Sequence, residues 1–168
     1  MSTKTVGAFE AALDRLDVDW THATRSDFAS TIAAVVESPA VGVELPFEGV
    51  SLAETPVDVD PTPARLEGAR TGVTAARMGI ADYGSVVLES TPEGGEPVGL
   101  YAERHVAVLR REDVVPGMRE AFARFGPWLR EGRDSAVIAT GPSATADMGG
   151  LVKGAHGPKE VHVVILDE

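Results

Sequence analysis

The sequence contains no cysteine, and this absence excludes several kinds of site. Disulfide bonds cannot form, and thiolates of this chain can hold neither zinc nor an iron–sulfur cluster. No apolar run is long enough to span a membrane as a helix. The first sixteen residues are amphipathic but lack the apolar centre of a signal peptide, so we expect a cytoplasmic protein with no membrane partner.

Lysine is also scarce, because only Lys4, Lys153 and Lys159 among the 15 basic residues are lysine. The 26 acidic residues give a formal net charge of -11. A lysine-poor, acid-rich composition favours a halophilic protein from a salt-accumulating organism over a merely acidic one. The negative field repels phosphate backbones, so we expect no nucleic-acid partner.

The length of 168 residues favours a single domain, 1–168, with its own core. Apolar spacing predicts helices over 5–16 and 27–36, within a helical N-terminal segment 1–38. Residues 46–63 are dense in proline and acid and predict a flexible loop. Pro63 opens a short predicted helix that ends at Arg70.

The remaining elements are predicted from apolar runs and turn residues. Strands are expected at 41–45, 85–89, 98–102, 105–110, 135–140 and 160–167; helical turns at 75–81 and 143–150; and a helix from Pro116 to about Gly132 with Met118, Phe122, Phe125 and Leu129 inward. Several strands are continuously apolar and alternate with helices. This combination predicts layered α/β architecture around a mainly parallel sheet that is buried on both faces.

The stretch "TGPSATADMGG", which begins at Thr140, is the first candidate site. If a helix follows the turn, its first amide groups lie at the carboxyl edge of the sheet, where they attract an anion. Gly141 allows the backbone to approach a ligand, and Ser143 or Thr145 can cap the helix or donate to a bound oxygen. The alternative is an ordinary turn and cap, which the turn alone favours.

Known catalytic and metal motifs are absent from the chain. It has no Walker loop, dinucleotide fingerprint or HExxH sequence. "GPSAT" differs from a nucleophile elbow because Thr145 stands where that turn needs glycine. His156 and His162 do not have a known metal-ligand spacing, so we expect no metal site.

Two histidines and two aspartates are further candidates. His105 begins a strand, and His156 is flanked by glycines in "GAHGP", so both are candidates for a ligand site. Asp82 in "IADYG" and Asp147 in "TADMG" are carboxylates in glycine-containing turns. Each is either a base or a cap, since turns favour aspartate for local hydrogen bonding.

Three blocks of the last hundred residues together resemble the LUD domain, and most of all its lactate-utilization protein C branch. They are "GVTAARMGIADYGSVVL", "LYAERHVAVLRREDVV" and "TGPSATADMGGLVKGAHGPKEVHVVILDE". The resemblance implies a three-layer α/β/α sandwich like that of the NagB/RpiA/CoA transferase superfamily, with its site at strand ends. It also places family motifs on Thr140, Gly141, Ser143, Thr145 and Asp147.

The same resemblance places a family "HGP" motif on His156 and Gly157 and a strand histidine on His105. It implies a role in oxidising L-lactate to pyruvate together with iron–sulfur partner subunits. Since this chain lacks cysteine, the clusters belong to those partners and no cofactor is expected here. The family's Ala-Glu-Thr-Gly is "ADYG" in this chain, and the shorter Asp82 disfavours the covalent chemistry of the related transferases.

Three functions remain open from the sequence. The first is an accessory lactate-utilization protein that binds a small anionic metabolite. The second is a stand-alone enzyme of the CoA-transferase or isomerase kind, with Asp82 or His156 as its base. The third is a module that senses a carboxylate without turning it over.

Overall fold

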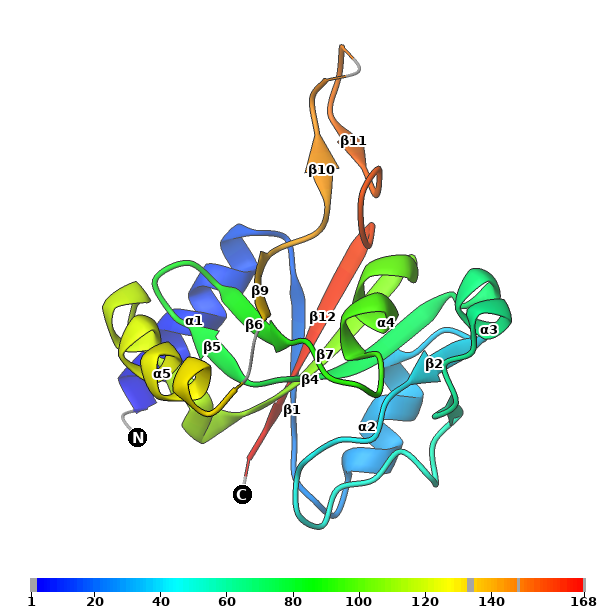
Figure 1. The fold of residues 1–168 in the computed structure, drawn as a ribbon, viewed down its shortest axis with the longest axis horizontal. Helices are drawn as coiled ribbons and strands as arrows, with labels where there is room; N and C mark the ends of the chain where they lie inside the picture. Colours follow the sequence, from blue (N-terminus) through cyan, green and yellow to red (C-terminus); the bar gives the residue numbers. More distant parts are fainter. Residues whose placement is uncertain (1–2, 133–134, 148, 168) are drawn as a thin grey trace.

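The computed structural model describes residues 3–132, 135–147 and 149–167, and its centre is a six-stranded parallel sheet (Figure 1). In spatial order its strands are β1 (Asp19–Ala23), β12 (Glu160–Leu166), β7 (Arg104–Arg110), β4 (Thr71–Ala76), β2 (Ala40–Gly42) and β3 (Val57–Asp58). Every neighbouring pair in this order is parallel. Among the described residues, no helix is both long and apolar enough to cross a membrane.

Alternating side chains of the central strands enter two different cores, one on each face of this sheet. On β7, Val106 and Val108 pack with α2 (Phe28–Val35), whereas Ala107 and Leu109 pack with α1 (Thr3–Arg15). All four side chains are fully buried. Burial on both faces explains why the sequence of this strand is apolar without interruption, and it confirms the predicted α/β class with a parallel sheet flanked by helices.

A second, four-stranded sheet lies over the α1 face. Its strands are, in order, β8 (Val114–Val115), β5 (Met78–Ile80), β6 (Ser85–Glu89) and β9 (Ala136–Thr140), and the 3-10 turn η1 (Arg111–Asp113) leads into β8. The helix α5 (Met118–Arg130) packs on the outer side of this sheet, where Ala121 is fully buried. The second sheet therefore encloses space between itself and the first.

Two short helices and a projecting hairpin complete the fold. The helices are α3 (Pro63–Gly68) and α4 (Gly95–Tyr101), and the hairpin strands are β10 (Ala144–Thr145) and β11 (Val152–Lys153). A Cβ atom on Gly72 would lie 2.1 Å from the Val98 carbonyl oxygen, so glycine lets α4 approach β4. We call residues 143–147 and 149–158 the arm, because they extend away from the body in Figure 1.

The structure corrects three predictions of secondary structure in the first hundred residues. The segment 1–38 is not wholly helical, because β1 lies between its two helices. Residues 75–81, expected to be a helical turn, form the end of β4 and all of β5. Residues 98–102, expected to be a strand, mostly belong to α4, whose close packing on Gly72 overrides the strand preference of Val98 and Tyr101.

Two further corrections concern the C-terminal half. The stretch "SATADMGG" does not form a helix: its described part enters the arm, where Ala144 and Thr145 pair with β11. In α5, Phe122 and Leu129 were expected to face inward but are 62% and 59% exposed. Met118 and Phe125 do pack against the core, together with Trp128, so the buried face is rotated from the predicted one.

Candidate functional site

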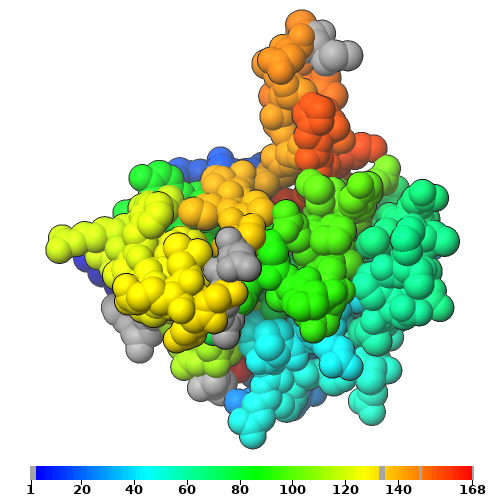
Figure 2. Space-filling model, viewed as in Figure 1, coloured from blue at the N-terminus to red at the C-terminus, as the bar shows by residue number. Residues whose placement is uncertain are grey.

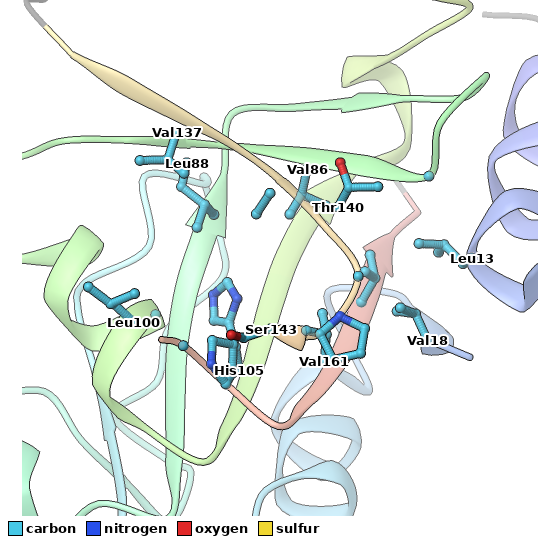
Figure 3. Close-up of a pocket in the computed structure, with 18 of the residues that line it drawn as sticks. Leu13, Val18, Val86, Leu88, Leu100, His105, Val137, Thr140, Ser143 and Val161 are labelled. Atoms are coloured by element: carbon cyan, nitrogen blue, oxygen red, sulfur yellow. The ribbon is translucent and has the colours of Figure 1, made fainter. Parts of the chain in front are cut away.

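A cavity of about 280 Å³ lies between the two sheets, closed on its sides by α4 and by the base of the arm. In Figure 3, His105 and Ser143 lie between Leu100 on one side and Leu13 and Val18 on the other. The labelled side chains that form its apolar walls are Leu13, Val18, Val86, Leu88, Leu100, Val137 and Val161. This size is at the lower end of ligand pockets, roughly 300 Å³ and above, so the cavity suits a small metabolite.

His105 is the most deeply buried polar group of the cavity wall. It is 2% exposed, and burial lowers its pKa to about 4, so the ring is neutral at physiological pH. Its Nε2 atom lies 2.8 Å from the Thr74 hydroxyl. The Nδ1 atom of the same ring has no hydrogen-bond partner in the described part of the chain. Since every fully buried side-chain nitrogen or oxygen of the described residues has a partner, Nδ1 is not fully buried, and it opens into the cavity. The tautomer decides whether it donates or accepts.

The base of the arm supplies Ser143, His156 and Gly157 to the same wall. The Ser143 amide donates to the Pro158 carbonyl at 2.9 Å, and the Ser143 hydroxyl accepts from the His156 amide at 3.3 Å. These bonds hold the two sides of the arm together where it leaves the body. They leave the hydroxyl hydrogen of Ser143 as a donor for a ligand.

Thr140 and Gly141 also line the cavity. The Thr140 hydroxyl lies 2.7 Å from the Ser85 hydroxyl, so it links β9 to β6. Gly141 has φ 66°, a left-handed conformation that glycine adopts without strain, and the chain turns there from β9 toward the arm. We assign Thr140 and Gly141 to the shape of the cavity.

Three predicted site residues lie outside this cavity. Thr145 and Asp147 are on the arm beyond its base, where Thr145 accepts a hydrogen bond from the Asp147 amide at 3.3 Å. Asp82 is exposed near the start of α5, and a Cβ atom on Gly117 would lie 2.5 Å from its carboxylate. The structure therefore brings together His105, His156, Ser143 and Gly157, but not Asp82.

The expected anion site at a helix terminus is wrong in two respects. No helix follows "GPSAT", and the Ser143 amide is bonded to Pro158, so neither a helix dipole nor that donor is available. The cavity also lies toward the amino ends of β7 and β12, since His105 is the second residue of β7 and Pro158 precedes β12. The cavity lies at this end of the sheet because the arm, after leaving β9, returns to the amino end of β12.

Among the described lining residues, Glu96 is the one carboxylate, and neither lysine nor arginine is present. The Ser90 hydroxyl donates a hydrogen bond to the Glu96 carboxylate. Sequence reasoning missed Glu96, Gly99 and Leu100 because it placed a turn and a strand where α4 lies. The local signal for α4 is weak, since this seven-residue helix contains two glycines and a proline.

A second cavity, of about 320 Å³, lies beyond the carboxyl ends of β2 and β4. It is lined by side chains that include Glu44, Phe47, Arg77 and Asp113, and none of the predicted site residues is among the described residues around it. Leu88 lines both cavities and separates them. The candidate site is therefore the first cavity, where the predicted residues meet.

Comparisons with known proteins identify the family to which this fold belongs. The model of the LUD domain matches residues 3–166. Lactate utilization protein C of Oceanobacillus iheyensis is 29% identical over 92 residues, which are 52% of this chain and 40% of that protein. The protein of the same name from Geobacillus thermodenitrificans is 34% identical over 96 residues, covering 52% of this chain and 39% of its own length.

A solved structure extends the comparison to the whole fold. The crystal structure of a DUF162 family protein from Deinococcus radiodurans superposes with a TM-score of 0.76 and covers 99% of both chains, at 20% sequence identity. At that identity the likeness concerns the fold, whereas the curated relatives are matched over about 40% of their length. From the match over 3–166, the chain belongs to the LUD domain family.

Proposed function

We propose that this chain is an accessory protein of lactate utilization that binds a small organic anion in the cavity at His105. The observation that carries the proposal is the convergence of His105, His156 and Ser143 on one small cavity with apolar walls. The names of the matched relatives supply the metabolic context. L-lactate and pyruvate are the first ligands to test, because each joins a carboxylate to a methyl group.

The polar and apolar parts of the cavity favour different parts of such a ligand. Ser143 and His156 line the cavity at the base of the arm, and a hydroxyl and an imidazole suit the carboxylate. The Nδ1 atom of His105 suits the hydroxyl or keto oxygen, because its neutral ring donates or accepts according to tautomer. The valine and leucine side chains accept the methyl group.

Binding, rather than covalent catalysis, is the role that these residues support. Asp82 stands where the related transferases carry their glutamate nucleophile, and it does not line the cavity, whereas the other candidate base, His156, does. Since the chain has no cysteine, we propose that electrons from lactate pass through iron–sulfur partner subunits, with this chain supplying a bound metabolite or a docking surface. A carboxylate-sensing module uses the same cavity and differs only in lacking those partners.

The experiment that tests the role is reconstitution with candidate iron–sulfur subunits of lactate utilization from the same organism. We expect the chain to co-purify with them and lactate-dependent electron transfer to fall when the chain is omitted. Ser143→Ala should lower that rate, whereas Thr145→Ala, a hydroxyl loss on the arm outside the cavity, should not. Unchanged turnover without the chain, together with no co-purification, rejects the accessory role.

A further inference from the structure

The strand β9 is an open edge of the second sheet. In the described part of the chain it pairs with β6 on one side, and no strand pairs with its other side. Val137 is 38% exposed and Ile138 is 37% exposed, and they point to opposite faces of the sheet. This edge therefore presents both unpaired backbone groups and apolar side chains to solvent.

The devices that normally protect an exposed edge are missing from β9. Such edges carry lysine, an inward charge or proline, or are covered by another element. Residues 135–146 contain no charged side chain, the longest such run in the chain, and Pro142 lies beyond the strand. The light orange surface of this region is visible between α5 and α4 in Figure 2. An edge of this kind is a ready template for pairing with a strand of another chain.

We propose that β9 pairs antiparallel with β9 of a second copy across a two-fold axis, which joins the two four-stranded sheets. The net charge of -11 opposes contact between two copies over most of the surface, but the run 135–146 carries none of that charge, which favours this edge as the place where they meet. A basic partner is drawn to the acidic surfaces of the protein, whereas two acidic copies meet with least repulsion where neither carries charge. A two-fold axis also matches the edge to itself, because identical strands present identical donors and acceptors.

This pairing connects assembly with the cavity. Val137, Ala139 and Thr140 of β9 line the cavity, while the free edge of the same strand faces the second copy. The partner thus fixes one wall of the cavity. The inference goes beyond the proposed ligand role, since the cavity is complete within one copy and pairing uses the backbone of the edge.

The first test is sedimentation equilibrium of the whole chain at micromolar concentration. We expect twice the monomer mass of 17.6 kDa for the wild type and the monomer mass for Ile138→Lys. The matched control is Val152→Lys, because Val152 is a β-branched side chain of 39% exposure on the arm, and this variant should remain dimeric. A monomeric wild type, or a dimer that Ile138→Lys leaves intact, overturns the proposal.

The second test does not depend on how well a lysine variant folds. Since the chain has no cysteine, single Cys substitutions at Ala136, Val137, Ile138 and Ala139 report pairing directly. Mild oxidation should cross-link the copies strongly at the position on the two-fold axis and weakly at Val152→Cys on the arm. Equal cross-linking at all of these positions contradicts strand pairing. No cross-linking along β9 also contradicts it, and this is the result expected if another protein covers the edge.

Discussion

The Nε2 atom of His105 lies 2.8 Å from the Oγ1 atom of Thr74, and each residue is 2% exposed. The bond joins β7 to its neighbour β4 and fixes the imidazole at the wall of the cavity. A buried hydrogen bond of this kind contributes to stability mainly because breaking it leaves a buried polar group without a partner. The position of the candidate ligand group thus rests on one side-chain contact within the sheet.

Burial of His105 makes the stability of the protein depend on pH in a defined direction. Its pKa is 6.5 when unfolded and about 4 when folded, so the unfolded state binds the proton more readily. The contribution of the neutral His105 ring to the free energy of unfolding is fully present above pH 6.5. It falls as the pH drops below that value and levels off near pH 4. The total is roughly 3 kcal/mol, at about 1.4 kcal/mol per pH unit. Urea unfolding across this window measures the effect.

The variant His105→Gln should flatten the dependence between pH 6.5 and pH 5, where carboxylates contribute little. The comparison uses the slope, because the variant also changes the absolute stability. His162 contributes a remaining slope of the same sign, since burial lowers its pKa too, with opposing and reinforcing effects from Asp19 and Arg104. The exposed His156 provides the control, His156→Gln. An unchanged slope in His105→Gln contradicts the buried, neutral ring.

Loss of the hydroxyl at position 74 should destabilise the protein. Thr74→Val keeps the shape of the side chain but leaves Nε2 of His105 unpaired, at an expected cost of about 1–3 kcal/mol in the free energy of unfolding. Thr74→Ser keeps the hydroxyl and loses one buried methyl group, which costs about 0.8 kcal/mol. Urea denaturation should rank the valine variant as the less stable; the reverse order speaks against the importance of this bond.

The elements that the sequence predicted well are those with a strong repeating pattern. The helix α1 has buried apolar residues three and four positions apart, and β7 and β12 are continuous apolar runs. Their burial follows from the pattern itself, which is why the parallel α/β class could be predicted.

The errors fall where distant contacts decide the local structure. The helix α4 depends on the space that Gly72 leaves, and the arm depends on pairing between segments several residues apart. Neither contact is visible in a short window of sequence. The structure brings His105, Ser143, His156 and Gly157, which the family motif marks, to one cavity, and their role in ligand binding stays a prediction. Glu96 and Leu100 were not predicted to line it, because they lie on the helix that was predicted as a turn and a strand.

Two glycine substitutions should have opposite effects on stability. Gly72→Ala places a Cβ atom 2.1 Å from the Val98 carbonyl oxygen, so α4 must move, at a cost of about 1–3 kcal/mol. Gly7→Ala lies within α1, where nothing is within 4 Å of the new methyl group, and should add about 0.5–1 kcal/mol. Thermal unfolding of both variants checks the pair, and a neutral Gly72→Ala would contradict the close approach of α4 to β4.

Asp82 should be dispensable for ligand binding. Its carboxylate lies beside Gly117 at the start of α5 and does not line the cavity. We expect Asp82→Asn to bind the same carboxylates with affinity within about twofold of the wild type, whereas a base or nucleophile at the site would not tolerate the change. A large loss of affinity in a folded Asp82→Asn variant would indicate that the carboxylates bind at Asp82 and not in the His105 cavity.

The most direct test of the central claim is titration calorimetry of L-lactate and of pyruvate against the wild type, Ser143→Ala, Thr145→Ala and His105→Gln. The cavity at His105 predicts saturable one-site binding of at least one of these acids to the wild type and to Thr145→Ala. It predicts binding at least about tenfold weaker, a loss of some 1.4 kcal/mol, in Ser143→Ala and His105→Gln. No saturable heat with either acid, or equal affinity in all four proteins, would contradict it.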